Sequence, residues 1–446
     1  MFKKNVTALA VAAAMGLPPA AAAQSQEELQ GLREEVKQLG KRVDEAEQAA
    51  IRASSRPTSE NALNPAVSLI LNGIYGNLSR DPAGFRIDGF VPTGGEVGPG
   101  VRGLSLGESE IALSSNIDHN FRGTGIFSVS PEDTISVEEA YIQTLSLSNG
   151  FTVKAGRFFS GLGYQNQVHA HAWDFTDAPL ASKVFLGNQR NDDGIQLKWV
   201  APTPVYFDLG VEAGRGGTFP GGPEGGRSKN GVASGVAFAH VGGDFGTGTA
   251  WQVGLSHLGT SPRDRAYDDI DSAGTPVTNT FSGKSRLWIV DGILKWAPNH
   301  NPTYTNFKLQ GEFFRRHENG SLVFDTAGDT AGGTQTSGYS STQSGWYLQG
   351  VYQFVPMWRI GYRYDRVSAG TTSNALVDSG ALTAADFPIL GAHNPTRHTV
   401  MIDWSPSEFS RVRLQGARDD SRADVTDNQV FLQYIVSLGA HGAHKF

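Results

Sequence analysis

Apolar and polar residues alternate with a period of two along much of this chain, most regularly near its C-terminus. From Val430 to Gly442 every second residue is apolar or small, whereas Gln433, Ser437 and His441 belong to the opposite face. A strand with this alternation can present one face to lipid and the other to a wetter interior. We therefore interpret this stretch, and its aromatic end at Phe446, as the closing strand of a membrane-spanning sheet.

The same alternation recurs in about 16 segments, which we predict to be antiparallel strands. Short turns follow every second strand, and longer polar, Gly-rich links follow most of the others. Outer-membrane barrels combine an even strand number with tight inner turns and longer outer loops. The pattern predicts an all-β fold, a transmembrane antiparallel β-barrel over residues 65–446. The predicted strands are 66–78, 107–117, 120–130, 134–146, 150–158, 192–200, 204–214, 232–243, 248–258, 284–297, 303–316, 344–355, 357–367, 395–405, 409–418 and 427–439.

The residues before the barrel follow different patterns. Residues 1–23 have a basic start, an apolar core and a small-residue end, which predicts a signal peptide. Residues 24–52 carry a heptad seam, which predicts a periplasmic coiled-coil helix. Because one such helix is marginal alone in water, we expect a homotrimer through residues 25–52, with a helix against the barrel as the alternative. Residues 53–64 are a predicted linker.

Composition narrows the class of protein. The chain has 446 residues, no Cys and a formal net charge of −7, so it carries no disulfide framework and no sign of a nucleic-acid partner. It also lacks a run of about 18 apolar residues that would predict a membrane helix. The motifs GPGVRG (98–103) and GLSLG (103–107) lack the strand-to-helix setting that catalysis would need. We therefore predict no enzymatic activity.

Charged residues on the inward faces of the strands are candidates for the lining of a pore. Charge on the lipid face near the midplane costs about 2–4 kcal/mol for Arg or Lys, so such residues should point into the lumen. They could set which solutes pass, or could hold one another and only maintain the wall. The predicted pore-lining residues are Glu110, Lys198, Lys308, Glu312, Arg359, Arg363, Asp365, Arg411 and Arg413.

The link over residues 160–191 is too apolar for a solvated outer loop, and we expect it to fold into the lumen and narrow it. Its candidate constriction residues are His169, His171, Trp173 and Asp174. His169 and His171, with Asp174 nearby, could bind a divalent metal through neutral imidazole. Packing inside the lumen is the alternative role.

Two further groups are candidates for metal binding. His441 and His444 form a second pair near the C-terminus, which could bind Zn²⁺ or simply titrate. Asp268, Asp269 and Asp271 could hold Ca²⁺ or meet lipopolysaccharide through bridging cations. No cofactor is required by the pattern, and the expected partners are outer-membrane lipid, lipopolysaccharide and small solutes.

Four segments resemble a proteobacterial family identified as zinc-regulated TonB-dependent outer-membrane receptors: HAHAWDF (169–175), NDDGIQLKWVAP (191–202), WSPSEFSRVRLQ (404–415) and LGAHGAHKF (438–446). The resemblance implies a bacterial outer-membrane location and metal-linked uptake. Receptors of this mechanism have about 22 strands and a plug domain. The residues between the predicted signal peptide and the barrel are too few for a plug, so we expect the plug to be absent.

The function we predict is that of an outer-membrane porin. Small polar or charged solutes would diffuse through the lumen, which the 160–191 loop narrows. A zinc or other metal uptake channel or receptor is the alternative, and a structural or adhesive barrel with a sealed lumen is a third hypothesis.

Overall fold

The fold was determined as a computed structural model. It describes residues 65–94, 97–130, 134–222, 230–298 and 300–439. The predicted signal peptide, coiled coil and linker lie outside these residues, as do His441 and His444. Among the described residues, no helix has the length and the apolar character needed to cross a membrane.

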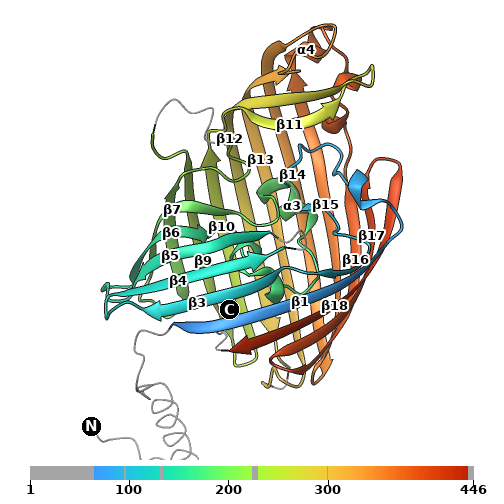
Figure 1. Cartoon of the computed structure of the whole chain (residues 1–446). Helices are drawn as coiled ribbons and strands as arrows, with labels where there is room; N and C mark the ends of the chain where they lie inside the picture. Colours follow the sequence, from blue (N-terminus) through green and yellow to red (C-terminus); the bar gives the residue numbers. More distant parts are fainter. Residues whose placement is uncertain (1–64, 95–96, 131–133, 223–229, 299, 440–446) are drawn as a thin grey trace, which may run out of the picture. The chain divides into compact units, whose positions relative to one another are not determined.

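The strands form one closed antiparallel sheet (Figure 1). The sheet closes where β1 pairs with β18, from Ser68 opposite Gly439 to Leu78 opposite Gln429. Because β2 and β3 share one place beside β1, and β11 pairs with β12 beyond the end of β10, the described wall is a barrel of 16 strands, as predicted. The strands are β1 (Ala66–Leu78), β2 (Gly103–Leu106), β3 (Ser109–Asn116), β4 (Phe121–Val129), β5 (Ile135–Thr144), β6 (Phe151–Phe159), β7 (Asn191–Val200), β8 (Tyr206–Gly214), β9 (Ser234–Phe245), β10 (Thr249–Thr260), β11 (Arg265–Ile270), β12 (Pro276–Trp296), β13 (Asn306–Phe324), β14 (Gln335–Val355), β15 (Trp358–Asn374), β16 (Thr396–Ser407), β17 (Ser410–Arg422) and β18 (Val425–Gly439).

Helical segments are short and lie in the connections. They are the 3₁₀ turns η1 (Pro82–Gly84), η3 (Gln165–Gln167), η4 (Ala170–Ala172), η6 (Ala384–Asp386) and η7 (Pro388–Leu390), and the helices α3 (Leu180–Leu186) and α4 (Ala375–Asp378).

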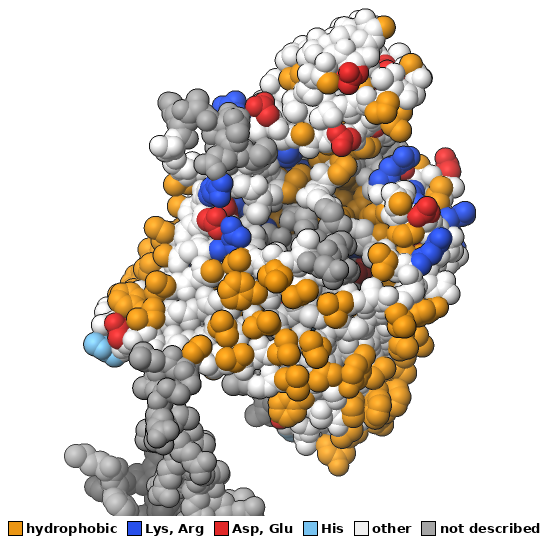
Figure 2. All heavy atoms as spheres, in the orientation of Figure 1, with side chains coloured by type: hydrophobic (Ala, Val, Ile, Leu, Met, Phe, Trp, Pro, Cys, Tyr) orange, Lys and Arg blue, Asp and Glu red, His pale blue; other side chains and the backbone are white. Residues whose placement is uncertain are grey.

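The two faces of the wall differ in polarity, as the period of two requires. Leu348 and Leu432 are 47% and 48% exposed on the outer face, whereas their neighbours Gln349 and Gln433 are 3% exposed on the inner face. Figure 2 shows apolar side chains in a broad belt over the outer surface of the barrel on the side in view. An apolar outside with a polar inside is the arrangement that lipid solvation favours.

Aromatic rings lie on the outer face beside the short turns. Trp358 stacks on Trp404 with ring centroids 6.0 Å apart, and Phe151 lies 6.3 Å from Trp199. Trp and Tyr favour the boundary between lipid and water, so these pairs mark one rim of the membrane-spanning zone.

Strand length varies strongly around the barrel. Strands β3 to β8 have 8 to 10 residues each, whereas β12 to β15 have 17 to 21. Since about 9–11 residues suffice to cross the membrane, the long strands extend beyond it. There β11, α4, η6 and η7 cover them with an apolar cluster that includes Phe281, Phe324 and Phe387 (Figure 1).

These extensions correct the predicted strand limits. Residues 276–283, 317–324, 335–343 and 368–374 were expected to be loops, but they continue the strands. They are rich in Ser, Thr, Gly and Asn, because a strand outside the lipid needs no apolar outer face.

Candidate functional site

The loop between β6 and β7 lies inside the barrel, where α3 is visible in Figure 1. Asn166 ties the base of this loop together. Its Nδ2 donates to the carbonyls of Ser160 (2.8 Å) and Arg190 (3.0 Å), and its Oδ1 accepts from the Arg190 amide (2.6 Å). The loop therefore enters and leaves the wall at one point, and we call residues 160–191 the lumen loop.

Apolar packing holds one part of the lumen loop against the wall. Leu180, Val184 and Phe185 of α3 are almost fully buried, and Phe185 stacks on Phe314 of β13 at 5.7 Å. The helix ends at Gly187, whose φ of 67° is the left-handed conformation that favours glycine.

Charged groups hold the middle of the lumen loop against one side of the barrel, which we call the basic wall. Asp174 forms ion pairs with Lys308 of β13 and with Arg359 of β15, the latter at 3.1 Å. The loop carboxylate is buried, and an unpaired charge there would be costly. The basic wall is the inner face of β13 to β17, with Lys308, Arg359, Arg363, Arg397, Arg411 and Arg413.

A second loop carboxylate repeats this arrangement. Asp177 lies 3.2 Å from the Arg363 guanidinium and 3.3 Å from the Lys183 ammonium, and it also pairs with Arg397. The side chains of Arg363 and Arg397 are 1% exposed, so Asp177, together with Asp365 and Asp419 of the wall, neutralises charge that solvent does not reach.

Main-chain groups complete the contact with the basic wall. The Trp173 carbonyl accepts from Arg413 at 2.9 Å and from Arg411 at 3.3 Å. The Leu180 amide, at the start of α3, donates to Asp365 at 3.0 Å. Loop and wall thus satisfy one another's polar groups.

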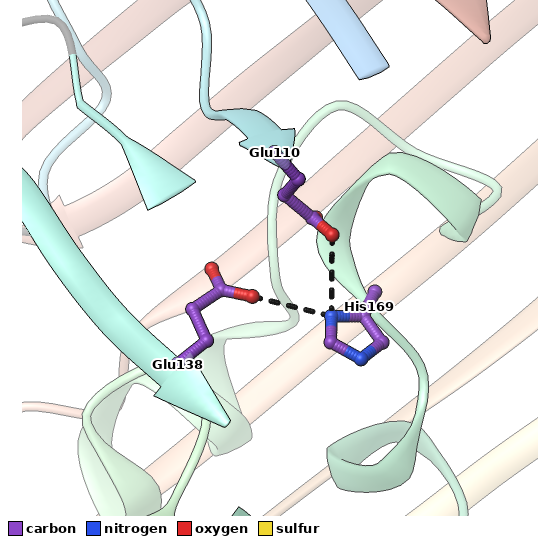
Figure 3. A group of neighbouring side chains, drawn as sticks. All are labelled: Glu110, Glu138 and His169. Carbon is purple, nitrogen blue, oxygen red and sulfur yellow. Dashed lines mark hydrogen bonds and ion pairs between the residues drawn. The ribbon is translucent and has the colours of Figure 1, made fainter. Parts of the chain in front are cut away.

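On its other side the lumen loop contacts acidic residues of the barrel wall. Glu110 of β3 and Glu138 and Glu139 of β5 form the acidic wall, and all three are less than 10% exposed. Nδ1 of His169 lies 3.2 Å from Glu138 Oε2 and 3.5 Å from Glu110 Oε2 (Figure 3). Its Nε2 lies 3.2 Å from Glu139 Oε2, and His171 Nδ1 lies 2.7 Å from Glu110 Oε1.

A β-bulge brings the two adjacent glutamates to the same side. On β4, Ile126 lies opposite Glu139 and the next residue, Phe127, lies opposite Val137, so Glu138 is the extra residue. Successive strand residues normally face opposite sides, but a bulge re-aims one of them. Glu138 and Glu139 therefore both point inward at His169.

The predicted metal site at His169, His171 and Asp174 is corrected by this geometry. Asp174 contacts the basic wall, not the histidines. The two imidazoles stack with centroids 5.8 Å apart, and each meets glutamate instead. The sequence reasoning included Glu110 only as a pore-lining residue and missed Glu138, Glu139 and Asp177.

The predicted calcium site is likewise not assembled. Asp268 is exposed and Asp269 buried on alternate faces of β11, and Asp271 accepts amides of its own turn. Asp268, Asp269 and Asp271 do not converge, and in the described ranges the metal-like grouping is Glu110 with Glu138 and His169.

The predicted pore-lining residues lie on inner faces, and most hold the lumen loop or one another. Glu312 accepts the Tyr164 amide at 2.6 Å and the Gln165 amide at 3.0 Å. Lys198 pairs with Asp208 at 2.5 Å. These contacts agree with the interpretation that the inward charges hold one another and the loop, and a role in selecting solutes stays a prediction.

Two cavities flank the lumen loop. One of about 490 Å³ is lined by Glu138, Arg157 and Asp177 among others, and one of about 430 Å³ by Tyr164 and His240. The first, which we call the outer cavity, lies towards the long outer connections. The second, the inner cavity, lies towards the short turn between β9 and β10. Loop residues line both, so the loop separates two open regions of the lumen.

No family model matches the chain. A protein of Aquifex aeolicus (strain VF5) that bears the name "Uncharacterized protein" is 29% identical over 416 residues, covering 87% of this chain and 81% of the relative.

A solved structure of an outer-membrane protein shares the architecture. The trimer form of OmpT from Vibrio cholerae superimposes with a TM-score of 0.50 at 10% identity, over 84% of this chain and 99% of that one. The outer-membrane channel DcaP of Acinetobacter baumannii gives a TM-score of 0.46 at 11% identity, over 84% and 97%. The protein is a bacterial outer-membrane β-barrel of the porin type of fold.

Proposed function

We propose that this protein is an outer-membrane porin through which small polar or charged solutes diffuse, and that the lumen loop narrows the passage. One observation carries the proposal. A closed barrel with a polar inner face contains the inserted lumen loop, with a cavity on each side of it. Its role would be passage, not catalysis.

The charges along this route are mixed. The outer cavity is lined by Glu138 and Asp177 as well as Arg157 and Lys183. The inner cavity meets both Lys198 and Asp208. Because rings of one charge give selectivity for the opposite charge, a mixed lining favours small polar solutes over a strong preference for one sign.

Conductance across a planar lipid bilayer tests the proposal. The refolded protein should give discrete current steps in salt, and deletion of residues 166–185 should enlarge them. The deletion variant must first be shown to form a barrel by its heat-dependent mobility in detergent. Absence of steps from both folded proteins would refute the pore and favour a sealed structural barrel.

We also propose that the chain assembles as a homotrimer through residues 25–52. The heptad seam supports this, since one such helix needs a partner. Light scattering of the detergent-solubilised mature protein should give three copies, and a variant lacking residues 25–52 should dissociate more readily on dilution. Equal stability of both assemblies would contradict the role of the helix.

Two expectations remain proposals about partners. The apolar belt of the outer face supports contact with membrane lipid. The exposed Asp268 and its neighbours on the outer hairpin favour contact with lipopolysaccharide through bridging cations. Metal uptake, the alternative function, would depend on His169, which lies against the acidic wall.

A further inference from the structure

We propose that Glu110, Glu138 and His169 bind one divalent metal ion, which fixes the lumen loop to the acidic wall. The site joins the loop to strands β3 and β5, so its ligands come together only in the folded barrel (Figure 3). The regulatory part of this proposal rests on the porin function, whereas the binding part does not.

The spacing of the ligand atoms fits a metal ion. Nδ1 of His169 lies 3.2 Å and 3.5 Å from the two glutamate oxygens, and the three ligand atoms lie within 4.8 Å of one another. Tetrahedral coordination with bonds of about 2.0–2.2 Å places neighbouring ligand atoms roughly 3.3–3.6 Å apart. The two distances to Nδ1 are already close to these values, so an ion would require adjustment of the glutamate side chains only.

The groups behind these ligands are those that a metal site needs. Glu139 Oε2 lies 3.2 Å from Nε2 of His169. It can accept a hydrogen bond from the Nε2–H group, which leaves Nδ1 unprotonated and free for a metal. The other Glu139 oxygen accepts the Phe159 amide at 3.0 Å, and His171 holds Glu110 through Oε1 at 2.7 Å. A carboxylate behind a ligating imidazole fixes its tautomer and orientation, as in known zinc sites.

The local charge favours a cation. Three carboxylates, each less than 10% exposed, lie within 3.5 Å of the His169 imidazole, and His171 contacts one of them, Glu110. Lys154 supplies one more positive charge near Glu139. An ion of charge +2 between Glu110 and Glu138 would balance the excess, and buried carboxylates are stabilised when they coordinate a metal.

The site is also accessible. Glu138 and Ala170 both line the outer cavity of about 490 Å³, which provides an entry route and room for a water on the ion. One imidazole and two carboxylates suit Zn²⁺ or Mn²⁺ better than the all-oxygen preference of Mg²⁺ and Ca²⁺. The chemical class of the ligand is therefore a borderline divalent transition-metal ion.

Calorimetric titration of the refolded mature protein with ZnCl₂ tests the binding. The protein carries no affinity tag, and His441→Gln/His444→Gln is present throughout so that the second histidine pair contributes nothing. We expect one Zn²⁺ per chain. Glu138→Gln and His169→Gln should weaken binding at least tenfold, and Glu139→Gln should weaken it about 10- to 100-fold.

Matched controls use residues that are exposed and far from the site in the fold. His317→Gln and Glu408→Gln remove the same chemical groups from exposed positions and should leave Zn²⁺ affinity unchanged. X-ray absorption at the zinc edge of the unsubstituted site should show one imidazole among oxygen ligands, and this readout needs no variant that might misfold. No bound Zn²⁺, or two imidazoles in the spectrum, would overturn the assignment.

The effect on the loop is measured separately. Zn²⁺ should slow amide hydrogen exchange in residues 160–190 of the unsubstituted protein and leave exchange in Glu138→Gln unchanged. If Zn²⁺ binds and protects the loop while bilayers show no current steps, the porin proposal fails and the metal site stands. If current steps appear but Zn²⁺ does not bind, the reverse holds.

Discussion

The lumen loop touches two sides of the barrel, and the two contacts have opposite signs. At the basic wall, loop carboxylates meet Lys and Arg; at the acidic wall, loop imidazoles meet glutamates. The basic contact consists of several ion pairs to guanidinium and ammonium groups, whereas the acidic contact depends on two imidazoles. The basic contact is therefore the main anchor of the loop, and the acidic contact is the one that a bound metal ion would alter.

The same two sides differ outside the membrane. Strands β13 to β15 of the basic wall continue into the outer cap, but β3 and β5 of the acidic wall end after 8 and 10 residues. A loop anchored mainly to the longer side is anchored to the part with the most strand pairing. Four substitutions would break or sharpen this comparison.

Asp177→Asn should have the largest effect. It leaves the buried guanidiniums of Arg363 and Arg397 without their loop counter-ion. Removing one partner of a buried ion pair costs about 3–5 kcal/mol, and we expect a loss of that size in the free energy of unfolding from urea titration in detergent. Asp268→Asn, on the outer hairpin, is the control, and an equal loss in both variants would show that the anchor is unimportant.

Leu348→Arg should cost slightly less. This residue lies on the lipid face of β14, and its neighbour Gln349 points inward to Asp174. An outward Arg near the midplane costs about 2–4 kcal/mol, whereas the inward arginines of the basic wall are compensated. Refolding yield and urea midpoint in lipid vesicles measure the change. An unaffected midpoint would mean that this face does not meet lipid.

His169→Gln should destabilise the protein by about 1–3 kcal/mol, the usual effect of losing hydrogen bonds to charged groups. It removes the imidazole between Glu138 and Glu139 but retains a polar side chain. The same urea titration, without added metal, compares it with Asp177→Asn. A larger loss for His169→Gln would reverse the ranking of the two anchors.

Asp386→Asn should have the smallest effect, limited to the outer cap. Burial would raise the pKa of Asp386, but hydrogen bonds from Ser272 and Thr383 lower it to about 2 from 3.8. A lowered pKa means that the carboxylate stabilises the cap above pH 3.8, and that this contribution disappears as the pH falls through about 2.

Chymotrypsin cleavage after Leu382, which is partly buried in the cap, measures that local effect at neutral pH. Cleavage should be faster in Asp386→Asn than in the unsubstituted protein, with the urea midpoint of the barrel unchanged. Asp378→Asn, which loses one exposed hydrogen bond to Ser373, is the control. Equal cleavage rates in the two variants would contradict the role of Asp386.

Alternation alone predicted the barrel because lipid imposes it on every membrane-crossing strand. It could not predict the outer halves of β12 to β15. Water surrounds both faces of the strands there, so the residues of the outer face are no longer apolar and the alternation disappears. It also could not reveal the acidic wall. Glu138 and Glu139 are adjacent, and a regular strand would send one of them into lipid. Two adjacent glutamates in a membrane-crossing strand were therefore the feature of the sequence that indicates a bulge. The pairing of Ile126 with Glu139 and of Phe127 with Val137 shows that bulge.

The tie at Asn166 has a consequence for how the barrel is assembled. Hydrogen bonds of Asn166 hold the base of the loop, and its sides contact the basic and acidic walls. Pairing of β1 with β18 closes the barrel around it. If the barrel closed first, the loop would have to enter it afterwards, and all of its charged groups would have to lose their hydration at the same time. We therefore expect β1 and β18 to pair last, after the lumen loop has taken up its position. Membrane insertion would then be complete only when the hairpin of β17 and β18 has formed.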